Sequence, residues 1–201
     1  MKKGEKRKVE LLKIAYELFI SKGYENTSVD EIISRADIAK GTYYYYFKSK
    51  EQMLEDVIDL MIESEAVEAE KIACSNIPVP RKIAGVITSL SPKEQERSIS
   101  EQLHKPENAL MHLKTRKKLI SVIVPLLSKV VEEGIEQGIF SCDNIEERVR
   151  MILALSDAVF NEDRFTDHSI EVFIDITEKI LGAGKGTMGF IEDLIGRSEA
   201  E

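Results

Sequence analysis

The 201-residue sequence predicts an all-α protein with a small N-terminal module and a larger helical body. Apolar residues recur at steps of three and four along most of the chain, which is the period of an amphipathic helix. The alternation of apolar and polar residues that marks a strand is nearly absent. Prolines, glycines and capping residues separate the helical stretches, so the chain should form many helices of ordinary length.

Three helices are expected in the N-terminal module. Residues 5–22 carry one apolar stripe, and a glycine directly afterwards ends that helix. The stretch "SVDE" at 28–31 is a capping box that opens a second, short helix. A tight turn at 36–39 follows, in which Asp37 is one of the few non-glycine residue types that tolerate positive φ. A third short helix should then run from about 39 to 47.

The larger body is expected to consist of helices that prolines separate. Ser49 is a plausible N-cap for a fourth helix, and the two prolines of "NIPVP" at 76–80 end it. Pro92 marks another helix start. Later helices are expected at 109–137, 143–160 and 166–182. Pro125 lies inside the first of these and should kink it.

Charge is divided unevenly along the chain. The whole sequence carries a net charge of −8, which taken alone argues against nucleic acid. Residues 1–50, however, hold 11 Lys and Arg against 7 Asp and Glu, a formal charge of +4, and the remainder carries −12. This asymmetry indicates a basic module on an acidic body, with chance clustering in a short window as an equal alternative.

The two short helices and their tight turn, placed on a basic module, predict a helix-turn-helix. The second helix of this motif must enter the major groove of DNA with its N-terminal residues against base edges. Ala39 and Gly41 are small enough to let the backbone approach closely. Lys40 can donate to a guanine or a phosphate, and Thr42 can donate to a phosphate or touch a thymine methyl.

The stretch "FISKGYENTSVDEIISRADIAKGTYYYYFKSKEQML" at 19–54 resembles the N-terminal domain of the tetracycline-repressor (TetR) family. The family usually has glycine in the turn where this chain has Asp37, and "EEGIEQGIF" at 132–140 is a further pattern frequent in the family. The resemblance implies a helix-turn-helix DNA-binding domain at 1–50 and a helical ligand-binding and dimerisation domain at 51–201. The matching pieces are Phe19, Gly23-Tyr24, Thr27-Ser28-Val29, Ile32, Ala36, Ile38, Lys40-Gly41-Thr42, Tyr44, Tyr46-Phe47 and Lys50-Glu51.

The tyrosine run "YYYYF" at 43–47 is expected to divide between core and DNA. Tyr43 and Phe47 are four residues apart, so they share one face and should pack on the first and fourth helices. The resemblance places Tyr44 and Tyr45 against DNA, where their hydroxyls would donate to phosphates. Tyr46 is ambiguous, since the matching family position often lies near the DNA backbone. The alternative for the whole run is an aromatic cluster that packs without a ligand.

Further phosphate contacts are implied at two helix starts. Lys50 would add a cation to the N-terminus of the fourth helix, and Thr27 and Ser28 would serve the second helix in the same way. The expected DNA-contacting residues are Thr27, Ser28, Lys40, Gly41, Thr42, Tyr44, Tyr45, Tyr46, Lys48 and Lys50.

The resemblance also implies an effector pocket and a dimer interface in the body. Pocket candidates between about 81 and 160 are Met111, Leu119 and Phe160, for each of which ordinary core packing is the alternative. The last two long helices would pair with their twins in a homodimer, although core burial explains the same apolar pattern. The expected interface residues are Ile152, Leu155, Ala158, Ile170, Phe173, Ile174, Thr177 and Leu181.

Catalytic, metal and nucleotide sites are not expected. The stretch "GAGKGT" at 182–187 lacks the glycine that a phosphate loop needs five residues before its Gly-Lys pair, and a helix precedes it instead of a strand. His104, His112 and His168 do not have the short spacings of zinc ligands. We therefore expect no metal, no cofactor and no enzymatic activity.

The sequence as a whole indicates a sequence-specific, DNA-binding transcriptional regulator. The resemblance implies a homodimeric repressor on a near-palindromic double-stranded operator, released by a small-molecule effector that the sequence does not identify. The alternative is a helical dimeric module that binds a ligand or a protein and no longer binds DNA. Neither an apolar run of membrane-spanning length nor a secretory signal occurs, and Cys74 and Cys142 read as reduced thiols, so a cytoplasmic protein with no membrane partner is expected.

Overall fold

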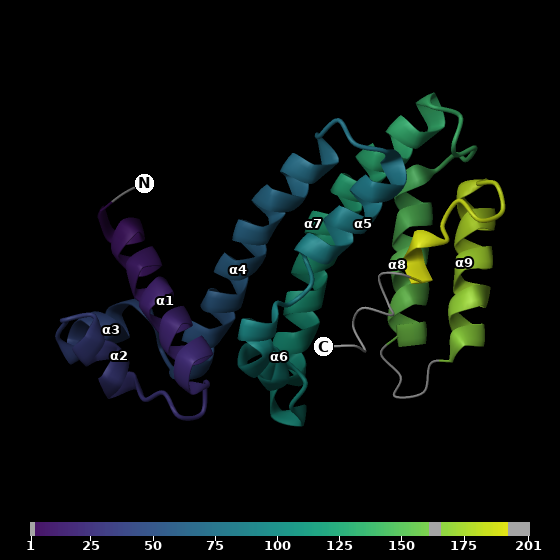
Figure 1. Cartoon of the computed structure of the whole chain (residues 1–201). Coiled ribbons are helices and arrows are strands. Elements are labelled where there is room, and N and C mark those ends of the chain that lie inside the picture. The colour runs from purple at the N-terminus through teal and green to yellow at the C-terminus, as the bar shows by residue number, and fades with distance from the viewer. Residues whose placement is uncertain (1–2, 161–165, 193–201) are drawn as a thin grey trace. The chain divides into compact units, whose positions relative to one another are not determined.

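The computed structural model describes residues 3–160 and 166–192, and every regular element in these ranges is a helix (Figure 1). The predicted all-α fold is confirmed. The α-helices are α1 (Lys3–Lys22), α2 (Val29–Arg35), α3 (Lys40–Tyr46), α4 (Lys50–Ala73), α5 (Val79–Ser89), α6 (Arg97–Leu103), α7 (Ala109–Glu136), α8 (Ile145–Phe160) and α9 (Asp167–Leu181). Two short 3₁₀ turns, η1 (Glu94–Glu96) and η2 (Pro106–Asn108), precede α6 and α7. No helix in the described ranges is long and apolar enough to cross a membrane.

The chain divides into two compact units. The first unit comprises Met1–Ser64 and Ser91–Leu119, and the second comprises Glu65–Leu90 and Ile120–Glu201. The long helices α4 and α7 therefore contribute to both units. The first turns of α4 bury their apolar side chains in the first unit, and the domain boundary expected after residue 50 stays a prediction.

A single apolar core holds the first unit together. The stripe predicted on α1 is buried, and α2, α3 and the start of α4 add side chains with no or almost no exposed surface. Burial of a large apolar side chain contributes about 1.5–3 kcal/mol relative to exposure, so these helices depend on one another for their stability. The most deeply buried members are Leu11, Ala15, Phe19, Ile32, Tyr43, Phe47, Met53, Leu54 and Val57.

The helix boundaries of the N-terminal module follow the predicted caps. The Ser28 hydroxyl accepts a hydrogen bond from the Glu31 amide at 3.1 Å and caps α2. Asp37 has a φ of 49°, so it occupies the left-handed conformation expected of it. The Ser49 hydroxyl accepts from the Gln52 amide at 3.2 Å at the start of α4. Local hydrogen-bonding chemistry therefore sets where these helices begin.

The second unit is tied together by two basic side chains. Lys82 on α5 is buried and pairs with Glu133 on α7 at 2.5 Å. Arg148 on α8 donates to the Ile180 carbonyl on α9 at 2.5 Å and to the Asp143 carboxylate at 2.8 Å. These contacts join α5 to α7 and α8 to α9, and Figure 1 shows α8 and α9 side by side.

Two proline expectations have different outcomes. α6 begins at Arg97 rather than at Pro92, because the Glu96 carboxylate accepts the Lys93 amide at 3.0 Å and closes the 3₁₀ turn η1 first. Pro125 lies inside α7, which continues through it, and the kink stays a prediction.

The end of α9 passes very close to the loop after α7. Gly182 has a φ of 62°, and a Cβ placed on it would lie 2.1 Å from the Ser141 carbonyl oxygen. The Ser141 amide in turn donates to the Leu181 carbonyl at 3.0 Å. The glycine-rich stretch after α9 thus begins with a helix C-cap.

Gly182→Ala should therefore lower the free energy of unfolding by about 3 kcal/mol, through left-handed strain and a clash with backbone. Gly138→Ala is the matched control, since Gly138 has a φ of 72° but no atom within 4 Å of an added Cβ. The control should lose only about 1 kcal/mol. Denaturant unfolding measures both, and equal losses would show that the close approach to Ser141 does not matter.

Candidate nucleic-acid interface

The turn between α2 and α3 is closed by backbone hydrogen bonds. The Ala36 amide donates to the Ile32 carbonyl at 2.9 Å, and the Ile38 amide donates to the Ile33 carbonyl at 3.2 Å. These bonds end α2, and the left-handed residue between them redirects the chain into α3. The arrangement is a helix-turn-helix with α3 as its second helix.

The rotation of α3 about its own axis is fixed by two buried rings. Tyr43 and Phe47 have no exposed surface, and their ring centroids lie 5.5 Å apart. The Tyr43 hydroxyl donates to the Ser49 carbonyl at 3.4 Å. Burial, followed by the charges of Tyr44 and Glu51, raises the pKa of Tyr43 to about 12, so this hydroxyl remains a donor. The predicted burial of Tyr43 and Phe47 on one face of α3 is confirmed.

The opposite face of α3 is open. Tyr44 is 51% exposed and Tyr45 is 81% exposed, whereas Thr42 and Tyr46 are partly covered. An added Cβ on Gly41 would meet no described atom within 4 Å, so the helix backbone is not crowded at this position. An exposed pair of tyrosines is costly apolar surface for a free protein and is typical of a binding face.

Two exposed lysines flank this face. Lys40 is the first residue of α3, and its ammonium pairs with the Asp30 carboxylate at 3.1 Å. Lys48 follows α3, and its backbone amide donates to the Gln52 side chain at 2.8 Å. The Asp30 contact raises the pKa of Lys40, so this lysine stays charged.

Lys50 has a different environment from the one expected. Its ammonium donates to the Tyr24 carbonyl at 2.9 Å and to the Thr27 carbonyl at 3.0 Å, and it lies 4.1 Å from the centre of the Tyr24 ring. The side chain therefore anchors the α1–α2 connection to α4. The sequence did not indicate these contacts, because the two carbonyls come from residues more than 20 positions away, and a phosphate contact by Lys50 stays a prediction.

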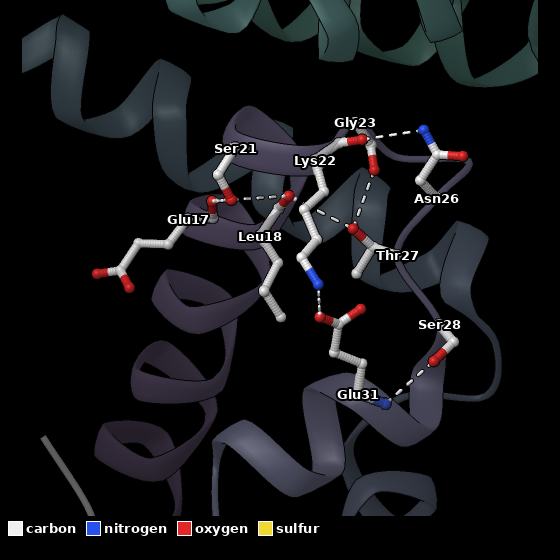
Figure 2. Close-up of polar contacts among 9 residues, drawn as sticks. All are labelled: Glu17, Leu18, Ser21, Lys22, Gly23, Asn26, Thr27, Ser28 and Glu31. Atoms are coloured by element: carbon white, nitrogen blue, oxygen red, sulfur yellow. Dashed lines mark hydrogen bonds and ion pairs between the residues drawn. The ribbon is translucent and has the colours of Figure 1, made fainter.

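The α1–α2 connection is held by hydrogen bonds from its own side chains (Figure 2). Thr27 is only 1% exposed, and its hydroxyl donates to the Gly23 carbonyl at 2.9 Å and to the Leu18 carbonyl at 3.4 Å. A side chain this buried cannot reach a phosphate, so the expectation of a DNA contact by the Thr27 hydroxyl is corrected. Ser28 is exposed, and its cap position leaves its hydroxyl proton available to a phosphate.

Sequence reasoning missed a set of contacts between α1 and the segment around α6, all within the first unit. The Tyr16 hydroxyl donates to the buried Glu96 carboxylate at 2.8 Å. The Tyr24 amide donates to the Ser98 hydroxyl at 3.3 Å. The Lys105 ammonium pairs with the Glu25 carboxylate at 2.5 Å. Residues about 80 positions apart make these contacts, and no short motif marks them.

The three pocket candidates are not gathered in one unit. Met111 is buried and Leu119 is half-buried, and both lie in the first unit. Phe160 ends α8 in the second unit, and its side chain lies outside the described residues. Their assignment to an effector pocket stays a prediction. Within the described ranges, no three His, Cys, Asp or Glu side chains gather in a way that could hold a metal ion.

The expected dimer residues divide between surface and interior. Ala158 is exposed, whereas Ile152, Leu155 and Ile170 are half-buried. The other four are already buried within the chain and leave little surface for a second copy: Phe173, Ile174, Thr177 and Leu181.

Exposed apolar side chains that the sequence analysis did not single out lie on the same two helices. Met151 is 60% exposed, Val172 is 43% exposed and Ile176 is 36% exposed. Val172 and Ile176 are four residues apart, as neighbours on one helix face are, and Ala158 follows Met151 by seven. The helical period can identify these residues as one apolar face. It cannot show which of two apolar faces is exposed.

A helix-turn-helix with a fixed second helix and an open, tyrosine-rich face between lysines defines a DNA-binding protein. Two family models match the chain: "Bacterial regulatory proteins, tetR family" at residues 11–57 and "Tetracyclin repressor-like, C-terminal domain" at residues 92–179. The chain belongs to the tetracycline-repressor (TetR) family of DNA-binding transcriptional regulators.

Relatives of known sequence or structure agree with this assignment. The chain is 22% identical over 142 residues to YhgD, an uncharacterized helix-turn-helix regulator of Bacillus subtilis, covering 68% of this chain and 74% of YhgD. It is 44% identical over 52 residues to the transcriptional repressor KstR2 of Mycolicibacterium smegmatis, covering 26% of this chain and 25% of KstR2. The crystal structure of RolR with its ligand resorcinol matches with a TM-score of 0.59 at 18% identity, covering 97% of this chain and 95% of RolR. At that identity the likeness to RolR is one of fold.

Thr27→Val tests the corrected role of Thr27. The variant keeps the side-chain shape but removes the hydroxyl that donates to the Gly23 and Leu18 carbonyls, so the free energy of unfolding should fall by about 1 kcal/mol. DNA affinity of the folded protein should not change. Thr42→Val on α3 is the matched control, and it should weaken DNA binding while changing stability by less than about 0.5 kcal/mol. Denaturant unfolding and DNA titration of both variants measure the two effects. If Thr27→Val keeps wild-type stability but binds DNA more weakly, a structural role for the Thr27 hydroxyl is contradicted.

Proposed function

We propose that this regulator is a homodimeric repressor that binds a near-palindromic operator and leaves it when a small molecule binds the helical body. The observation that carries the DNA-binding mode is the orientation of α3. Buried Tyr43 fixes the helix, and Tyr44 and Tyr45 are thereby turned outward beside Lys40. This face has the shape, charge and hydrogen-bond donors that a major groove and its phosphates require.

We assign roles on DNA to residues of α3 and to the lysine that follows it. Tyr44 and Tyr45 donate their hydroxyls to phosphate oxygens and place their rings against sugar edges. Lys48 adds a charge to the phosphate backbone, and Gly41 lets the helix backbone approach closely. Lys40 and Thr42, at the N-terminal end of α3, are the residues that reach base edges.

Two copies are needed to present two recognition helices to successive major grooves, roughly 34–36 Å apart. We assign the dimer contact to the exposed apolar surface on α8 and α9, centred on Met151, Ala158, Val172 and Ile176. A two-fold axis would bring this surface against itself and produce a four-helix packing. The half-buried Leu155 would complete it.

The effector would act on the contacts between α1 and the α6 segment. Glu96, Ser98 and Lys105 each bind a residue of α1 or of the connection after it, so a shift of this segment reaches the helix-turn-helix directly. A ligand releases the operator only if it binds the altered conformation more tightly than the DNA-bound one. RolR, which shares the fold, has been crystallised with resorcinol, and a small molecule is the effector class we propose here. A regulator of this kind acts on chromosomal DNA in the cytoplasm.

Tyr44→Phe should weaken binding to a DNA duplex selected by the wild-type protein from a random-sequence library. The loss should be about tenfold or more, because a hydrogen bond to a charged group contributes about 1.5–3 kcal/mol. For wild type, log K against log salt should fall with a slope of about −4 to −7, as on the order of four to eight phosphate contacts require. Fluorescence anisotropy across a salt series gives both quantities.

Tyr43→Phe is the matched control for this experiment. Its hydroxyl faces the Ser49 carbonyl inside the protein, so its removal should leave DNA affinity unchanged. Wild-type protein that selects no duplex, with a salt slope near zero, would contradict the DNA-binding function and favour a helical module that binds only a ligand or a protein.

Ala158→Lys should convert the dimer to a monomer, because a lysine charge buried at the apolar α8–α9 surface costs several kcal/mol. Operator binding should be lost at the same time, since one recognition helix lacks the fixed half-site spacing. Gln137→Lys, an exposed substitution at the end of α7, is the control and should stay dimeric. Light scattering measures the mass of each. A monomeric wild type at micromolar concentration would exclude the two-half-site arrangement.

A further inference from the structure

We propose that Asp30 is a positioning residue for DNA recognition: by holding Lys40, it keeps that lysine from the phosphate backbone and leaves it for a base edge. This inference rests on the proposed DNA-binding function of α3. It assigns a role in sequence discrimination to an acidic residue, which is the residue type least expected to favour DNA.

The contact joins the first turns of the two motif helices. Asp30 is the second residue of α2, Lys40 is the first residue of α3, and their charged atoms are 3.1 Å apart. The Asp30 and Lys40 side chains are 78% and 63% exposed. Exposed ion pairs contribute only about 0–1 kcal/mol to stability, so the pair does little for the fold. Because the ion pair is exposed on the helix-turn-helix, we expect it to affect DNA recognition rather than stability.

The Asp30 carboxylate accepts one of the hydrogen bonds that the Lys40 ammonium can donate. An ammonium group has three donors, so one donated to Asp30 leaves two for a ligand. Guanine presents two acceptors, O6 and N7, on its major-groove edge. A lysine free to move would instead follow the nearest phosphate, which binds every sequence alike. Asp30 competes with phosphate for Lys40, because both are anions.

The second exposed lysine of this face has a different setting. Within the described residues, Lys48 has no carboxylate partner, whereas Lys40 does. The two lysines therefore have different roles. Lys48 binds backbone phosphate without regard to sequence, and the Asp30-bound Lys40 discriminates between base sequences. The raised pKa of Lys40, caused by the hydrogen bond from its ammonium to Asp30, agrees with a pair that persists at neutral pH.

Asp30→Asn is the test. Affinities for the wild-type-selected duplex and for a scrambled duplex of the same length and composition are measured across a salt series. The variant should bind the scrambled duplex at least about threefold more tightly, with a salt slope steeper by about two per dimer, one for each Lys40 that gains a phosphate. The ratio of selected to scrambled affinity should fall about fivefold or more. Asp30→Glu keeps a carboxylate, so it should keep most of the wild-type ratio of selected to scrambled affinity.

Two further variants separate positioning from simple charge repulsion. Asp37→Asn removes one negative charge from the same motif, tolerates the same left-handed backbone, and has no ion pair with Lys40. Asp37→Asn should change the affinities for both duplexes by the same factor. In a Lys40→Ala background, Asp30→Asn should no longer alter the ratio, because the residue it acts through is gone.

The outcomes distinguish the two proposals. Wild-type protein without preference for a selected duplex contradicts the proposed function, and the role of Asp30 fails with it. Wild-type preference, with an Asp30→Asn ratio no different from that of Asp37→Asn, overturns only the role of Asp30. A change of ratio that persists in the Lys40→Ala background overturns it as well, since Asp30 would then act without Lys40.

Discussion

The burial of Tyr43 and Phe47 in the first unit is the constraint on which the DNA-binding face depends. Four consecutive tyrosines on a helix point in four directions, so fixing one of them fixes the other three. Once Tyr43 has no exposed surface, Tyr44 and Tyr45 must turn outward. The same burial sets the direction of Lys40 one turn earlier. A hydrophobic contact therefore decides the orientation of a polar binding surface.

Polar side chains of the first unit also bind within the protein. Lys50 binds two carbonyls of the α1–α2 connection, and Thr27 closes that connection with its own hydroxyl. Buried Glu96 accepts hydrogen bonds from the Tyr16 hydroxyl and the Lys93 amide, which satisfies a carboxylate that would be costly to bury without partners. These polar groups therefore bind within the protein and connect its helices.

Features that depend on residues close together in the sequence were predicted correctly. The cap at Ser28, the left-handed Asp37 and the glycine that ends α1 all occur where their residue types predict them. Each of these depends on a few neighbouring residues. The start of α6 departed from the prediction because the Glu96 side chain closed a 3₁₀ turn ahead of the helix. Family resemblance in the N-terminal third supplied the DNA-binding interpretation, which the two family models then confirmed.

The sequence by itself determined the helical fold, the helix-turn-helix and the division of the tyrosine run between buried and exposed side chains, because periodicity, caps and a dense motif all act over short distances. Only the tertiary structure decided which polar residues near the motif are free to meet DNA. Thr27 and Lys50 look like phosphate ligands in the sequence. The Thr27 hydroxyl, however, is buried and donates within its own connection, and Lys50 binds carbonyls that folding brings to it. The same holds on α9, where Thr177 is interior and Ile176 is exposed, although both belong to one apolar pattern. A helical period shows that a face is buried, but the packing of neighbouring helices decides which face that is.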